Sequence, residues 1–166
     1  MLRGDRVALR PATPGDLPRF AAIIAEPEVA RWWGEQKEGD DLRDDFFAAD
    51  VTSYAVEVDG ELAGFIMCSE ITDPQYRSAG IDIALATAWQ GGGLGTDAVR
   101  TLARHLLEDR GHHRLTIDPA ASNERAIASY RKAGFRPVGV MRSYERGSDG
   151  TWHDGLLMDM LAGELR

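Results

Sequence analysis

The chain has 166 residues and a mass of 18.2 kDa, with 43% apolar and 28% charged residues, a balance typical of a single globular domain spanning residues 1–166. Acidic residues outnumber basic ones by 27 to 19, giving a net charge of -8, which argues against nucleic acid as the main partner and is compatible with a cationic substrate. The sequence contains no apolar run near the roughly 20 residues of a membrane span, and its first residues lack a signal-peptide core, so we expect a cytoplasmic protein without membrane attachment.

The first third of the chain predicts one strand followed by helices. Thr13 has the features of a helix cap, because Pro14 follows it and Asp16 stands three residues later. The predicted elements are a strand at 6–10, a helix running from Thr13 to residue 24, a short helix at 28–33, a charged loop at 34–41 and one or two helical turns at 41–49.

Two β-rich runs, 54–58 and 61–69, flank Asp59-Gly60 and predict an antiparallel hairpin. A polar loop at 71–78 leads to a strand at 79–85. Alternation along that strand predicts one face with Ile81, Ile83 and Leu85 and another with Asp82 and Ala84.

A glycine-rich turn with Gly91, Gly92, Gly93 and Gly95 separates this strand from a helix predicted at 96–110, with Thr96 as its cap. One face of that helix is apolar, and Asp97, Arg100, Arg104 and Glu108 are expected on the opposite, solvated face. The amides of such a helix start suit a phosphate or pyrophosphate, although a plain tight turn is the alternative interpretation. The spacing fits neither a P-loop nor a dinucleotide fingerprint.

The remaining third alternates strands with one helix. The predicted elements are a strand at 114–118, a turn at 120–123, a helix at 124–133, an extended segment at 135–142, a turn at 148–150 and a strand at 152–160. Hairpins mixed with strand-helix-strand crossovers predict a mixed sheet with helices on its faces, an α/β or α+β layered fold.

Two runs carry a family resemblance. Gln90, Gly93 and Gly95 match the Q/R-x-x-G-x-G/A pattern of the GNAT N-acetyltransferases, and the run from Asp118-Pro119 to Gly134-Phe135 is similar to the same family. The resemblance covers about residues 54–162 and is closest to the aminoglycoside 6'-N-acetyltransferases, although the segment 147–157 departs from that subfamily. It implies a mixed, mostly antiparallel sheet with flanking helices and a splayed pair of parallel strands.

The resemblance further implies acetyl-coenzyme A as co-substrate. The positions that it places at the cofactor are Ile83, Ala84, Leu85, Gln90, Gly91, Gly92, Gly93, Leu94, Gly95, Thr96, Asn123, Ala126, Tyr130 and Lys132. Ile83 or Ala84 is expected to offer the amide that meets the oxyanion. No metal is expected, because the histidines lack metal-ligand spacing.

Acetyl transfer to an amine requires a proton acceptor for the nitrogen and a proton donor for the departing thiolate. The resemblance implies Asp118 as the acceptor and Tyr130 as the donor, with Asp82 and Asp118 binding a cationic substrate. Plain structural roles, such as a turn at Asp118 or packing at Tyr130, are the alternatives. Trp32 or Trp33 is expected to line the acceptor cleft, and Asp154 to add negative charge to it.

The sequence leaves the acceptor open. The first hypothesis is the 6'-amine of an aminoglycoside, and the second is another amine: a protein N-terminus, a polyamine or a siderophore-type amine. A coenzyme A-binding domain without turnover is the third. Dimers are common in the family, so a homodimer is possible.

Overall fold

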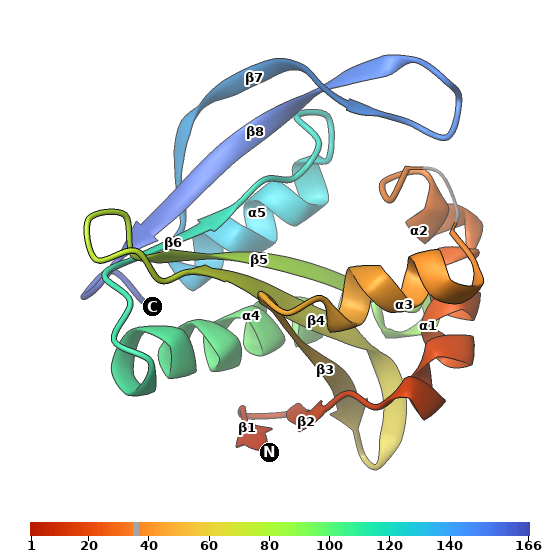
Figure 1. Ribbon diagram of the computed structural model, residues 1–166, viewed down its shortest axis with the longest axis horizontal. Helices are drawn as coiled ribbons and strands as arrows, with labels where there is room; N and C mark the ends of the chain where they lie inside the picture. Colours follow the sequence, from red (N-terminus) through yellow and green to blue (C-terminus); the bar gives the residue numbers. More distant parts are fainter. Residues whose placement is uncertain (35–36) are drawn as a thin grey trace.

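The computed structural model describes residues 1–34 and 37–166. Within that part of the chain, eight strands form one sheet in the order β1-β2-β3-β4-β5-β6-β8-β7, and β5–β6 is its parallel pair (Figure 1). The strands are β1 Leu2–Arg3, β2 Ala8–Pro11, β3 Val51–Val58, β4 Glu61–Ile71, β5 Ser78–Leu85, β6 Arg114–Ile117, β7 Arg136–Arg146 and β8 Trp152–Leu161. The helices are α1 Leu17–Ile24, α2 Pro27–Ala30, α3 Gly39–Phe47, α4 Leu94–Arg104 and α5 Glu124–Ala133. This mixed, mostly antiparallel sheet with flanking helices confirms the predicted fold class.

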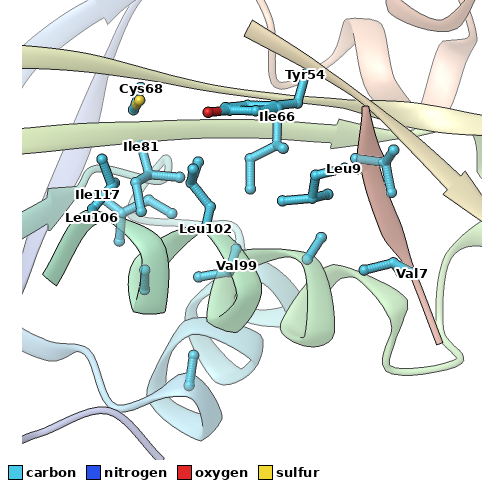
Figure 2. Packing of buried hydrophobic residues seen from close by; sticks show 14 of the residues in the cluster. Val7, Leu9, Tyr54, Ile66, Cys68, Ile81, Val99, Leu102, Leu106 and Ile117 are labelled. Atoms are coloured by element: carbon cyan, nitrogen blue, oxygen red, sulfur yellow. The ribbon is translucent and has the colours of Figure 1, made fainter. Parts of the chain in front are cut away.

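The sheet buries a different core on each face. Helix α4 packs with Val99 and Leu102 against Ile66 and Ile81 of the sheet (Figure 2). On the opposite face, α1 and α3 bury a cluster in which the rings of Phe20, Phe46 and Phe65 lie about 5 Å apart. Because side chains alternate along a strand, the same strands supply both cores.

The parallel strands β5 and β6 separate after two paired positions. Ala79 pairs with Leu115 and Gly80 pairs with Thr116, after which β6 continues to pair only with β8. Amides of β5 that face the opening therefore have no strand partner there. Asp82 and Asp118 each stand two residues beyond the last pair, so both carboxylates belong to the same sheet face at the point of separation.

The start of α4 differs from the sequence prediction. The cap is Gly93, whose φ of +82° favours glycine, and the helix begins at Leu94, so Thr96 is not the cap. Asp97, expected on the solvated face, is buried: its carboxylate accepts hydrogen bonds from the backbone N–H groups of Asp5, Arg6 and Val7 at 2.8–3.1 Å. A carboxylate with three backbone donors is stable in a buried position, which periodicity could not reveal.

The β7–β8 hairpin is longer than predicted. The extended segment expected at 135–142 continues to Arg146, and Figure 1 shows the hairpin arching over the sheet on the side of α2. Its pairing register shifts between Met141 and Glu145, and Ser143 adopts a left-handed φ of +48°. This bulge rotates the following residues of β7 relative to a regular strand.

Most other predicted boundaries hold within a few residues, but the helix predicted to reach residue 110 is α-helical only to Arg104 and continues as a π-helix over His105–Asp109. The strand expected at 6–10 is β2, preceded by the short β1. Helix α3 begins at Gly39, inside the loop predicted at 34–41, and residues 35–36 of that loop lie outside the described residues. Among the described residues, no helix is both long and apolar enough to cross a membrane.

Candidate active site

A two-part cleft lies where β5 and β6 separate. The larger half, about 360 Å³, extends from the glycine turn to α5, and the smaller half, about 170 Å³, surrounds the ends of the two strands. Both halves share the side chains of Trp32, Trp33, Ile83, Asn123 and Tyr130. A reactant in one half can therefore meet a reactant in the other beside Tyr130.

The larger half contains most of the residues predicted at the cofactor. Those that line it are Ile83, Ala84, Leu85, Gln90, Gly91, Gly93, Gly95, Thr96, Asn123, Ala126, Tyr130 and Lys132. Gly92 is exposed beside this lining, and the side chain of Leu94 packs in the core under α4. The positive φ angles of Gly91 and Gly93 shape a turn whose backbone leads into the α4 N-terminus, where unpaired amides favour an anion.

Hydrogen bonds hold the glycine turn from both sides. The side-chain Nε2 of Gln90 donates to the Leu85 carbonyl at 2.8 Å, and its Oε1 accepts from the Arg125 guanidinium at 3.2 Å. On the other side, the Arg6 guanidinium donates to the Gly92 carbonyl at 2.5 Å. The turn is thus fixed to β5, to α5 and to the N-terminal segment, as a preformed anion site requires.

Positive side chains lie where a phosphorylated ligand would enter. Arg125 and Lys132, both on α5, line the larger half of the cleft. Arg125 was not among the cofactor residues predicted from the sequence, although it lies in the similar run. Together with the α4 amides they fit a pyrophosphate carrier such as coenzyme A, and the apolar Ile83–Leu85 wall fits its pantetheine arm.

The smaller half is acidic. Asp82, Asp118 and Glu145 line it, and none of the described lysine, arginine or histidine side chains forms an ion pair with them. Burial by surrounding protein, followed by the charges of Asp118 and Glu145, raises the pKa of Asp82 from 3.8 to about 6, even though its side chain reaches cleft water. A cation would relieve this repulsion.

Tyr130 stands at the junction of the two halves. Burial, and then the negative charges of Asp82 and Asp118, raise the pKa of its phenol. The hydroxyl therefore stays protonated throughout the neutral range and is available as a proton donor. Its ring packs against Phe135 at 6.5 Å, which fixes its position on α5.

Trp32 and Trp33 form a wall shared by both halves. The ring of Trp33 contacts Phe65 edge-on at 5.0 Å and so belongs partly to the core. Trp32 lies under the guanidinium of Arg31, 4.6 Å from the ring centroid. Both indoles line the cleft.

Asp154 lies on β8 outside the residues that line the cleft. Its carboxylate accepts the backbone N–H of Ser143 at 2.8 Å and so holds the β7 bulge. The next residue of β7, Tyr144, donates its hydroxyl to the Asp118 carboxylate at 2.6 Å. Neither Tyr144 nor Glu145 was predicted, because a bulge breaks the alternation on which strand patterns depend.

Comparison with known proteins agrees with this geometry. The profile of the acetyltransferase (GNAT) domain matches residues 6–136. The chain belongs to the GNAT family. It is therefore an N-acetyltransferase that depends on acetyl-coenzyme A. Among the described residues, no group of His, Cys, Asp or Glu side chains is arranged to hold a metal ion.

Individual relatives differ in the acceptors that their names specify. The chain is 33% identical over 157 residues to an aminoglycoside N(6')-acetyltransferase type 1 of Klebsiella pneumoniae, covering 82% of this chain and 77% of the relative. It is 31% identical over 141 residues to the spermidine N(1)-acetyltransferase of Escherichia coli K12, covering 81% and 75%. The structure of AAC(6')-Ib in complex with ribostamycin and coenzyme A is similar, with a TM-score of 0.77, 29% identity and coverage of 95% and 94%.

Proposed function

We propose that this protein acetylates a primary amine of a polycationic small molecule, the 6'-amine of an aminoglycoside. One observation carries the proposal: the strand ends beside the cofactor half bear carboxylates with no cationic partner among the described residues. An aminoglycoside supplies several ammonium groups, and the indoles of Trp32 and Trp33 suit the faces of its sugar rings. The similarity to the Klebsiella enzyme supports the same acceptor.

Asp82 is the better proton acceptor of the two strand-end carboxylates. A general base is most effective when its pKa lies near the working pH, and the pKa of Asp82 is raised to about 6. Asp118 accepts a hydrogen bond from Tyr144, which fixes its carboxylate at the strand end, where it can anchor the ammonium group. This division reverses the roles that the family resemblance implied for the two residues.

Acetyl-coenzyme A supplies the activated acetyl group. The substrate ammonium gives a proton to Asp82, and the neutral nitrogen attacks the thioester carbonyl. A β5 amide near Ile83 or Ala84, on the side that has lost its β6 partner, stabilises the oxyanion. When the carbon–sulfur bond breaks, Tyr130 donates its hydroxyl proton to the leaving thiolate, and the second proton that the nitrogen loses as it becomes an amide returns to the Tyr130 oxygen.

A polyamine is the second candidate acceptor. The specific observation is the similarity to the spermidine enzyme of Escherichia coli, which nearly equals that to the Klebsiella enzyme. An acidic cleft lined by indoles also suits a flexible chain of ammonium groups.

The experiment is a thiol-release assay with purified protein, acetyl-coenzyme A and a panel of amines. Kanamycin, which has a 6'-amine, is compared with spermidine and with a peptide bearing a free N-terminus. Release with kanamycin and not with the others supports the aminoglycoside reading. Thiol release with spermidine alone supports a polyamine acceptor. If none of the amines causes thiol release, the proposed turnover is contradicted.

A further inference from the structure

We propose that Glu145 is a specificity-determining residue, which binds a second cationic group of the acceptor while the reacting amine lies at Asp82 and Asp118. The inference rests on the proposed function, because it deepens the description of the same acceptor pocket. It predicts acceptors that carry at least two ammonium groups.

Glu145 reaches the pocket from an element remote from the splayed strands. It lies near the end of β7, yet its side chain lines the smaller half of the cleft with Asp82 and Asp118. The carboxylate remains open to water, so a ligand can reach it. Burial, followed by the charge of Asp118, raises the pKa of Glu145, as expected for a carboxylate facing other acids.

The β7 bulge fixes Glu145 in this place. Ser143 takes its left-handed conformation with its N–H bonded to the Asp154 carboxylate. Tyr144 then turns inward to donate to Asp118, and Gly155 leaves room for its ring, since a Cβ there would lie 2.8 Å from Tyr144 Cδ1. Two hydrogen bonds and one glycine thus set the direction of the next side chain, Glu145.

The end of β7 also approaches the residue that follows the two indoles. Gly34, which follows Trp33, is buried and has a φ of +67°. A Cβ at Gly34 would lie 3.3 Å from Glu145 Oε1 and 3.4 Å from the Arg146 carbonyl oxygen. The β7–β8 hairpin therefore meets the segment after α2, and Glu145 lines the smaller half of the cleft together with Asp82.

The charge of His153, the register partner of Glu145 on β8, offsets only part of the negative charge around this carboxylate. No described lysine, arginine or histidine forms an ion pair with Glu145, and the His153 ring is paired with Asp149 at 3.0 Å. Three carboxylates around one small cavity repel one another, and a reacting ammonium group compensates only part of that charge. A second ammonium group of the acceptor is the natural partner of Glu145.

The test compares Glu145→Gln with Glu61→Gln, a variant with the same change in net charge at the exposed β3–β4 turn. Calorimetric titrations of spermidine and of kanamycin into protein saturated with coenzyme A give the dissociation constants. Thermal melting first establishes that both variants are folded. We expect Glu145→Gln to weaken binding of the polycation by roughly tenfold, and Glu61→Gln by less than about twofold.

Turnover then separates this inference from the proposed function. With propylamine and 1,3-diaminopropane as acceptors, Glu145→Gln should reduce the preference for the diamine through KM, with kcat nearly unchanged. Equal binding by the two variants would overturn the role of Glu145, whether or not acetyl transfer occurs. Glu145-dependent binding without any turnover would support the inference and refute the proposed reaction. Failure of the unmodified protein to bind either polycation would overturn both.

Discussion

Replacing Asp82 by Asn tests the proposed proton acceptor, because the pKa of this carboxyl predicts how kcat/KM should depend on pH. The pKa of about 6 means that roughly 90% of the carboxyl groups are ionised at pH 7 and roughly 10% at pH 5. In the unmodified enzyme, kcat/KM for a protonated amine should therefore rise about tenfold between pH 5 and pH 7 and level off above pH 7. Loss of the base should lower kcat by about 100-fold at pH 7.5, and the acidic limb should disappear.

Stopped-flow thiol release across pH 5–8, with kanamycin and spermidine as acceptors, gives both quantities. Asp118→Asn is the matched variant: if Asp118 anchors the substrate, its main effect is a raised KM. If Asp82→Asn keeps a near-normal kcat and the same fall of kcat/KM at acidic pH, Asp82 is not the proton acceptor. Asp118 would then be the better candidate for that role.

Four further outcomes follow from the same structure. Because burial raises the folded pKa of Asp82 above the unfolded value of 3.8, the stability that its protonated form contributes is present below pH 4 and lost as pH rises through 6. Asp82→Asn should therefore melt higher than the unmodified protein at pH 8 and equally at pH 4, and the opposite order would contradict the assigned shift. Tyr130→Phe should lower kcat at least tenfold while coenzyme A still binds, as fluorescence titration can establish; unchanged kcat would remove its role as acid. In Gly95→Ala the new Cβ lies 3.7 Å from Leu85 Cδ1, an ordinary contact, so the melting temperature should be unchanged. Coenzyme A should bind about tenfold more weakly, because the methyl group stands where the phosphates approach the helix start. An unchanged affinity for coenzyme A would place the carrier elsewhere. Asp97→Ala should destabilise the fold by about 2 kcal/mol in urea unfolding, because three backbone donors lose their acceptor, and an unchanged midpoint would show that water replaces it.

The sequence predicted the elements wherever a local signal was strong. The Asp59-Gly60 turn has φ angles of +51° and +83°, as the dipeptide suggested, and the strand-glycine-helix run around Gly93 is present as expected. Asp82 lies on the sheet face opposite Ile81, as strict alternation requires.

Other features depended on contacts between distant segments. The burial of Asp97 is decided by three N–H groups about 90 residues away, which helical periodicity cannot register. A bulge held by Asp154 lets Tyr144 bond to Asp118 and Glu145 line the cleft, so a period of two predicted neither their direction nor the length of β7. The role of Asp154 as a substrate contact stays a prediction.

The central claim is that the amides opening α4 bind the phosphates of coenzyme A and place its thiol between the separated ends of β5 and β6. A crystal structure of the protein with coenzyme A and kanamycin tests it most directly. The account predicts the pyrophosphate at Gly93–Gly95, the sulfur beside Tyr130 and a substrate amine between Asp82 and Asp118. Coenzyme A bound outside this cleft, or an amine remote from both carboxylates, would contradict it.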